Sequence, residues 1–478
     1  MLFREKKPNR PSPMDAALRS RDTVMHRSIS VVVCFLMSAF SLAVLFSAQA
    51  RALNETAEAD VLTIDQAVKM ALANNRDLKI VSLNLESSKE KVLAAKTRRL
   101  PSFNVYTFAS QLLSPIAFQV EAGQFGTYPG IGPIPATNTN ISTPSRPTAY
   151  IFATASQPLL TLYKINLHVH GEELSVQQAV QELRDKRNTI VDDVRQAYYS
   201  VVEIQNVIEA TQASIKQYEE LDRITLEWVA EKVVLESDSL EVKAKLADER
   251  LKLLQAEDKL QTAKESLNNL LGRDLDIDFR AEEDKELSPV EQDLKAAQAT
   301  ALAQNPTVKE AEIKIQQADT MKRLAKSEYL PDMGASFHYL SPFGVNFLPT
   351  NVMGLGIELS WEPFDWGRRR DVVNEKAIAV EQSKLNLSQT KANILVNLDK
   401  QFRSLQEARM AVDVASAQQE AARVKLREVT DKYGQKTVLL RDVLQQQAAV
   451  DKANADYNEA IASFWTAKAD FQKALGED

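Results

Sequence analysis

Two long parts of the chain are almost free of helix-breaking residues, and this limits the possible folds more than any other feature. Glycine and proline are absent from 172–271, and a single glycine interrupts 368–475. Both residue types are costly inside helices. Apolar residues here follow gaps of three and four, as in Val194, Ala197 and Val201, which is heptad spacing. The pattern predicts long packed helices, and a run of about sixty residues would reach roughly 90 Å.

Two shorter windows, 101–158 and 331–363, have the opposite composition. They are rich in glycine, proline and aromatic residues, and segments of about ten residues within them alternate in part between apolar and polar residues. That length matches a tilted strand that crosses the hydrocarbon core of a membrane. The predicted strand pairs are 102–112 with 148–157 and 333–340 with 352–361, joined by external loops at 113–147 and around 341–351.

The sequence repeats itself over most of its length. Ala71-Leu-Ala-Asn-Asn75 recurs as Ala301-Leu-Ala-Gln-Asn305, and Leu100-Pro101 recurs as Leu330-Pro331 at the same offset. This period is too long for a solenoid unit, so it indicates a duplicated half-molecule. Each half would hold a helix, a strand pair and a long helix hairpin. We expect a first structural repeat at 62–270, a linker at 271–291 and a second repeat at 292–475.

The N-terminus predicts secretion. Basic residues precede an apolar run at 31–46, and two small-x-small sites follow it, Ala48-Gln-Ala50 and Ala50-Arg-Ala52. The run of about sixteen residues is short for a membrane span, so 1–52 is predicted to be a cleaved signal peptide, with a retained anchor helix as the alternative. Farther along, no apolar stretch approaches the ~20 residues of a transmembrane helix. A membrane would have to be crossed by strands.

Strands in lipid must have their edges paired, because an unsatisfied backbone group there costs several kcal/mol. Four strands cannot close a barrel. Two chains would supply eight strands and three chains twelve, and these observations alone do not choose between them. Since eight strands enclose little more than packed side chains, a conducting pore favours three or more chains.

Several motifs together resemble the TolC-like outer-membrane efflux proteins, from about Leu62 to Leu475. They are the Ala-Leu-x-x-Asn opening and the Leu-Pro pair of each half, Gln157-Pro-Leu159, Glu362-Pro-Phe-Asp-Trp-Gly-Arg368, and Asp-x-Leu after each hairpin tip. The resemblance implies a mainly α-helical homotrimer in the cell outer membrane. Each chain would give four strands to one 12-stranded transmembrane β-barrel, continued by a long α-helical barrel through the periplasm.

The resemblance also implies partners and a function. The channel would be a passive exit duct in a tripartite efflux or type I secretion system, surrounded by outer-membrane lipid and docked to a periplasmic adaptor and an inner-membrane transporter. The chain departs from the family pattern in three places. Residues 160–164 stand where a glycine-containing turn is usual, and Lys232 and Lys436 stand where glycine is common at the tips.

Particular residues follow from the same resemblance. The tips would dock the adaptor, although an ordinary hydrophobic turn explains such residues nearly as well. Asp442 and Asp238 would form the periplasmic gate. A threefold ring of carboxylates there would attract cations, and the repulsion between the carboxylates would favour the open state. The alternative for each is an Asp favoured at a helix N-terminus. The docking residues are Val233, Val234, Leu235, Thr437, Val438 and Leu439.

A second group of residues fits the boundary of the membrane. Trp361, Phe364 and Trp366 precede Arg368 in a short segment, as aromatic and basic anchors do at membrane interfaces. An ordinary solvated helix start is the alternative.

Other classes of function find little support. The net charge of −7, from 58 basic and 65 acidic residues, indicates no nucleic-acid partner. Catalytic motifs such as Gly-x-Ser-x-Gly and His-Glu-x-x-His are absent, so we expect neither an enzyme nor a cofactor. His168 and His170 point to different sides of a helix, and no metal site is expected. The competing interpretation is an envelope coiled-coil scaffold without channel activity. The cargo, whether drugs, metal ions or polypeptides, is left open.

Overall fold

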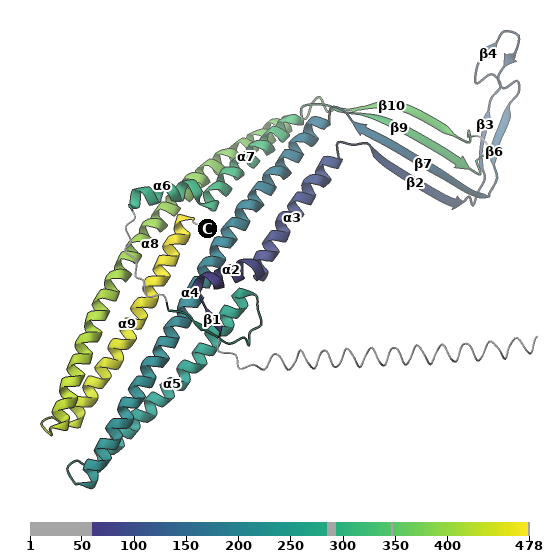
Figure 1. The fold of residues 1–478 in the computed structure, drawn as a ribbon. Coiled ribbons are helices and arrows are strands. Elements are labelled where there is room, and N and C mark those ends of the chain that lie inside the picture. The colour runs from purple at the N-terminus through teal and green to yellow at the C-terminus, as the bar shows by residue number, and fades with distance from the viewer. Residues whose placement is uncertain (1–59, 284–292, 346–347, 477–478) are drawn as a thin grey trace, which may run out of the picture. The chain divides into compact units, whose positions relative to one another are not determined.

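The computed structural model describes residues 60–283, 293–345 and 348–476 (Figure 1). The predicted signal peptide, 1–52, and the last part of the predicted linker, 284–291, lie outside the described residues. Contacts divide the described chain into a small unit, formed by Asp60, Val61 and 278–280, and a large unit formed by the rest. Strand β1 (Asp60–Leu62) pairs with β8 (Phe279–Ala281).

The large unit has the same order of elements twice. In each half, two short helices precede two long strands, and a helix hairpin follows the strands. The first half contains α2 (Ile64–Asn74), α3 (Arg76–Thr97), β2 (Ser102–Gln111), β7 (Pro147–Pro158), α4 (Leu162–Ala230) and α5 (Glu236–Leu271). The second contains α6 (Leu294–Gln304), α7 (Pro306–Ser327), β9 (Asp332–Phe343), β10 (Val352–Ser360), α8 (Arg368–Gly434) and α9 (Leu440–Leu475).

The repeated Ala-Leu-x-x-Asn motif builds a helix joint. Its Asn ends one helix and caps the next: the Asn75 side chain accepts a hydrogen bond from Leu78 N at 3.0 Å, and Asn305 accepts one from Thr307 N at 2.9 Å. The Ala residues of the motif, Ala71 and Ala301, are fully buried. The motif therefore recurs because the same capped joint is needed in both halves.

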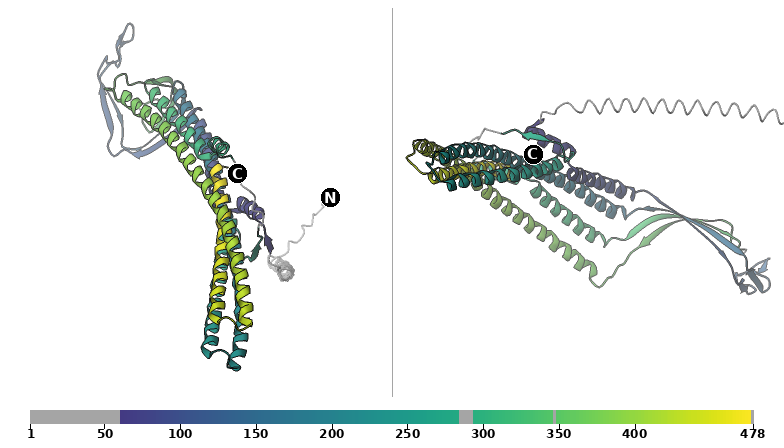
Figure 2. Two further views of the ribbon diagram at one scale, coloured as in Figure 1. Left: turned by 90° about the vertical axis from the view of Figure 1, so that its left-hand side faces the viewer. Right: turned by 90° about the horizontal axis from the view of Figure 1, so that it is seen from below.

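The two breaker-free stretches each form one uninterrupted helix with a shorter antiparallel partner. Helices α4 and α8 are 69 and 67 residues long, or about 100 Å at 1.5 Å per residue. Helices α3 and α5 lie one after the other along α4, and α7 and α9 do so along α8 (Figures 1 and 2). Asn75 Nδ2 donates to Leu270 O at 2.8 Å, which ties the end of α5 to the start of α3.

The long strands form a four-stranded antiparallel sheet in the order β10-β9-β7-β2. The two predicted strand pairs are its two hairpins, and the central β7–β9 pairing joins the two halves, with Phe152 opposite Leu340. Strands β2 and β10 are the edges. The described strands contain no further partner for either edge.

The segment between β2 and β7, which the sequence predicts to be a loop, has strands of its own. β3 (Ile116–Val120) pairs with β6 (Thr139–Thr143), and β4 (Thr127–Tyr128) pairs with β5 (Gly132–Pro133) beyond them. Glycines and prolines around each short strand hide its pattern in the sequence. Arg146 Nε donates to Gly344 O at 2.8 Å, so the base of this hairpin is tied to the turn after β9.

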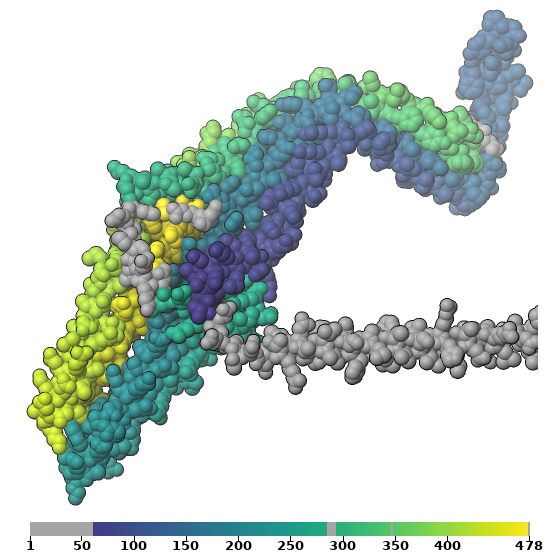
Figure 3. All heavy atoms as spheres, viewed as in Figure 1, coloured from purple at the N-terminus to yellow at the C-terminus, as the bar shows by residue number. Residues whose placement is uncertain are grey.

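The ends of the two helix hairpins lie side by side and share a core (Figures 1 and 3). Trp228 of α4 meets Tyr433 of α8 with ring centroids 4.7 Å apart. Around this contact, buried residues from α4, α5, α8 and α9 form a single cluster, so the hairpins are packed together at their tips. Its members are Tyr218, Leu221, Val242, Leu246, Tyr433, Leu440, Val443 and Leu444.

None of the described helices has the length and the apolar composition needed to cross a bilayer.

We predict that Gly272→Ala destabilises the fold. Gly272 caps α5 with φ of +70°, and a Cβ there would collide with the backbone oxygen of Asn74. Left-handed geometry alone costs an L-residue about 1–2 kcal/mol, so the purified protein in detergent should show a clearly lower Tm. Gly434→Ala is the matched control, because nothing lies within 4 Å of the added Cβ. An equal Tm for the two variants would contradict the prediction.

Candidate functional site

The two hairpin tips have the same backbone shape. Lys232 and Lys436 both adopt φ of +60°, in the left-handed region that glycine enters without strain. The next residue closes each turn: Val233 N donates to Trp228 O at 2.8 Å, and Thr437 N donates to Lys432 O at 3.0 Å. This geometry suits glycine, which the resemblance implies at these positions, and this chain forms the turn with lysine.

The six predicted docking residues differ in exposure. Val233, Leu235 and Leu439 expose 45%, 70% and 59% of their surface, and Thr437 is also exposed. Val234 and Val438 are half-buried, and Val438 packs against the cluster at the tips. The tips therefore present apolar side chains to solvent at two equivalent places.

The two predicted gate residues lie at equivalent positions in the first turns of α5 and α9. Asp442 Oδ2 accepts a hydrogen bond from Leu439 N at 3.1 Å, so it caps α9. Asp238 lies on α5 close enough to Tyr433 for its charge to act on that hydroxyl: burial raises the pKa of Tyr433, and the charge of Asp238 raises it further. A capping role for Asp442 is thus built into the fold, whether or not the carboxylate also acts in a gate.

The residues that join the two tips were not predicted from the sequence. The Lys436 Nζ lies 5.4 Å from the ring centroid of Trp228, and the Trp228 ring contacts Tyr433. The only hint in the sequence is that an aromatic residue comes shortly before each tip lysine. Which aromatic residues meet depends on how two separate hairpins are rotated, and no local sequence pattern specifies that rotation.

The four residues predicted for the membrane boundary follow β10. Trp361, Phe364 and Trp366 expose 58%, 68% and 89% of their surface, and the rings of Phe364 and Trp366 meet at 4.7 Å. Arg368 pairs with Glu362 at 2.6 Å. These residues form an exposed aromatic group beside an ion pair.

The turn that carries this group is held by hydrogen bonds to Asp365. Asp365 accepts hydrogen bonds from Arg369 N and Gly367 N, and these bonds lower the pKa of its carboxyl group. Trp366 and Gly367 both have positive φ. The matching connection in the first half is shorter, because α4 begins soon after β7 through Thr161 with φ of −59°. The two strand-to-helix junctions therefore differ, as the departure at 160–164 suggests.

The two faces of the four-stranded sheet have different chemistry. Residues aligned across the strands share a face, so Val105, Ala153, Tyr339 and Met353 form one row. This apolar face carries no charged side chain anywhere along β2, β7, β9 and β10. Its large residues are widely exposed, with Leu355 at 84%.

The opposite face, here called the mixed face, is polar toward the helices and aromatic farther out. Ser102, Ser156 and Ser336 lie in one row, and Tyr106 and Phe152 lie in another. On the edge strand β2 its aromatic side chains are less exposed than the aromatic side chain of the apolar face, with Tyr106 at 56% and Phe108 at 45% against Phe103 at 76%.

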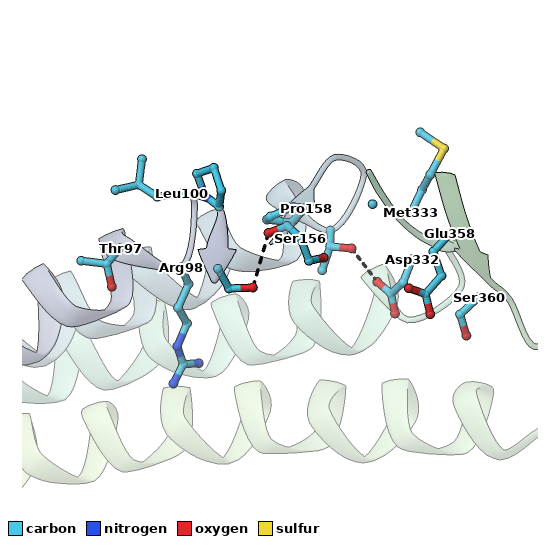
Figure 4. Close-up of a pocket in the computed structure, with 13 residues that line it drawn as sticks. Thr97, Arg98, Leu100, Ser156, Pro158, Asp332, Met333, Glu358 and Ser360 are labelled. Carbon is cyan, nitrogen blue, oxygen red and sulfur yellow. Dashed lines mark hydrogen bonds between the residues drawn. The ribbon is translucent and has the colours of Figure 1, made fainter. Parts of the chain in front are cut away.

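The mixed face ends in a pocket of about 700 Å³ where the strands meet the helices (Figure 4). Asp332 and Glu358 lie beside each other there, and Arg98 lines the other side. Asp332 pairs with Lys164 at 3.0 Å and accepts a hydrogen bond from Thr161 at 3.3 Å. Within the described ranges, no group of three or more His, Cys, Asp or Glu side chains could hold a metal ion.

Comparisons with solved structures show the same fold in several outer-membrane channels. The OprN channel has a TM-score of 0.70 at 16% identity, covering 87% of this chain and 90% of its own. CmeC of Campylobacter jejuni has a TM-score of 0.71 at 16% identity, covering 86% and 85%. The open state of MtrE of Neisseria gonorrhoeae has a TM-score of 0.67 at 16% identity, covering 87% and 89%. Comparison with curated protein sequences finds no match.

The family model described as "Outer membrane efflux protein" matches residues 67–273 and 297–477, which is most of both repeats. This is a family of channels and not of enzymes. The predicted fold class is confirmed, as is the location in the outer membrane with the helical part in the periplasm. The chain belongs to the outer membrane efflux protein family, with the fold of the TolC-like channels.

Proposed function

We propose that three copies of this chain form the exit duct of a tripartite efflux or type I secretion system, gated at its periplasmic end. The observation that carries the proposal is the open-edged sheet. Its apolar face suits lipid, yet β2 and β10 have no partner among the described strands. Unpaired edges are not tolerated in lipid, so other copies must pair with them. Three copies of a four-stranded sheet give 3 × 4 = 12 strands.

The difference between the two faces supports the orientation of the sheet in this barrel. Transmembrane barrels place apolar residues outside and polar residues in the lumen. The mixed face would line the lumen, because it carries Asp332 and Glu358 and because its large residues on the edge strand β2 are less exposed than those of the apolar face. Trp361, Phe364, Trp366 and Arg368 would then lie at the periplasmic boundary of the lipid.

The hairpin tips supply the proposed gate and the proposed docking surface. Threefold symmetry would bring Asp442 of each copy toward a common axis, where like charges repel, and Asp238 would lie at the equivalent place on the neighbouring hairpin. The exposed Val233, Leu235, Thr437 and Leu439, with Val234 and Val438 beside them, would meet a periplasmic adaptor. The adaptor would link the duct to an inner-membrane transporter that selects the cargo.

Assembly and conduction are tested together. Chemical cross-linking of the purified protein in detergent should stop at the mass of three chains, and the same protein should produce discrete ion currents in planar lipid bilayers. The envelope-scaffold alternative predicts no such currents. A cross-linked species of two chains, or a membrane-inserted protein that does not conduct, would contradict the proposed duct.

Asp442→Asn tests the gate without removing the helix cap. The amide oxygen can still accept from Leu439 N, whereas the charge is gone. We expect lower cation selectivity and a lower open probability in bilayer recordings, because a repelling ring of charges has been removed. Asp371→Asn, in the first turn of α8 at its other end, is the control. Unchanged selectivity and gating in Asp442→Asn would exclude the gate role.

Docking is tested by placing a photo-crosslinking amino acid at Val234 or at Val438. Irradiation of cells should link both positions to a periplasmic protein that also co-purifies with an inner-membrane transporter. The same probe at Leu385, which is 70% exposed on α8, should give no such adduct. Equal yields at all three positions would argue against docking at the tips.

A further inference from the structure

Five ring side chains gather on the mixed face of the sheet, in its half farther from the helices. This group is here called the aromatic patch, and it consists of Tyr106, Phe108, Tyr150, Phe152 and His338. The Tyr150 ring lies 5.3 Å from Phe108 and 6.2 Å from Tyr106, and Phe152 stacks on His338 at 6.1 Å and 11°. The rings come from three adjacent strands and form one surface.

The patch lies on the wrong face to anchor the barrel in lipid. Aromatic girdles of transmembrane barrels face outward at the two interfaces. On β7 both aromatic residues, Tyr150 and Phe152, stand on the mixed face, whereas the apolar face carries Ala149, Ile151, Ala153 and Ala155. A strand that needed only to satisfy lipid would place its aromatic residues on the other side.

Cross-strand packing accounts for only part of the patch. Neighbouring rings stabilise a sheet by fractions of a kcal/mol per pair. However, Tyr106, Phe108 and Phe152 still expose 56%, 45% and 38% of their surface. Continuous apolar surface left in contact with water usually marks a binding site. The exposed ring faces are therefore available to something that passes along this side of the sheet.

The ring faces of the patch favour a cation, and the strands themselves carry no Lys or Arg that would repel one. No Lys or Arg occurs anywhere in β2, β7, β9 or β10, and Glu358 and Asp332 are on the same face nearer the helices. Lys164 neutralises Asp332, and Arg98 lines the far side of the pocket at the base of the sheet. Ring faces attract cations directly and stack on planar aromatic groups.

We propose that the aromatic patch is a stacking surface for planar aromatic cations in transit through the lumen. This inference rests on the proposed duct, in which the mixed face lines the lumen and three patches surround one passage. It gives the exit duct a chemical preference of its own, so that the class of cargo is not set by the transporter alone.

The test uses the assembled protein in planar lipid bilayers, with ethidium as the planar aromatic cation and tetrabutylammonium as the non-aromatic cation. Ethidium should block the current at a lower concentration than tetrabutylammonium. Tyr150→Leu combined with Phe152→Leu keeps an apolar surface but removes two rings. It should raise the half-blocking concentration of ethidium about tenfold, the scale of lost aromatic stacking, and leave that of tetrabutylammonium within about twofold.

Two controls separate stacking from general effects. Phe337→Leu removes a ring from the apolar face of β9, and Tyr150→Phe keeps the ring while removing its hydroxyl. Ethidium should block both variants at the same concentration as it blocks the unmodified protein. Ethidium fluorescence anisotropy with the purified oligomer gives a second readout that does not require current, and it should show the same order of affinities.

The outcomes are distinguishable. A protein that carries no current would reject the proposed duct itself. A conducting channel that ethidium and tetrabutylammonium block equally, or a double Leu variant that retains ethidium block, would overturn the stacking surface alone. A double Leu variant that no longer assembles would assign the rings to packing and would also overturn the proposal.

Discussion

The need to pair every backbone hydrogen-bonding group in lipid governs this structure. A sheet of four strands with an apolar face and two open edges is not stable by itself in a membrane. Lipid offers no hydrogen-bond donors or acceptors to the edge strands β2 and β10. The barrel is therefore a property of the assembly, and a single chain carries only one part of its wall. The duplicated halves share this part equally, since each supplies one hairpin and the β7–β9 pairing joins them.

The helices lie in water, and the same Asn-capped joint organises them in both halves. An Asn ends one short helix and caps the next, and the same joint receives the end of the antiparallel helix through Leu270 in the first half. Apolar burial on narrow helix faces then holds the helices together, and one such cluster joins the two tips around Trp228 and Tyr433. Packing, more than helix propensity, makes such long helices stable.

Much of this fold could be predicted from the sequence, because its strongest signals are local. The absence of glycine and proline predicts the long helices, and strand-length segments in the aromatic windows predict the sheet. The hairpin at 116–143 was missed because its strands have only two to five residues.

The left-handed turns at Lys232 and Lys436 could be located only as departures from a glycine. The Trp228–Tyr433 contact depends on the rotation of two hairpins, which no local pattern specifies. The gate, docking and interface residues stay predictions, since their roles depend on copies and partners beyond a single chain.

The discontinuity on one side of each helix pair has a mechanical consequence. Helices α4 and α8 are continuous rods, whereas their partners are interrupted at Asn75 with Gly272 and at Asn305 with Gly476. A jointed rod beside a continuous one resists compression along its axis but has little bending stiffness at the joint. We therefore expect any bending of the helix pairs to concentrate at the level of these two joints and to leave the strands beyond them undeformed.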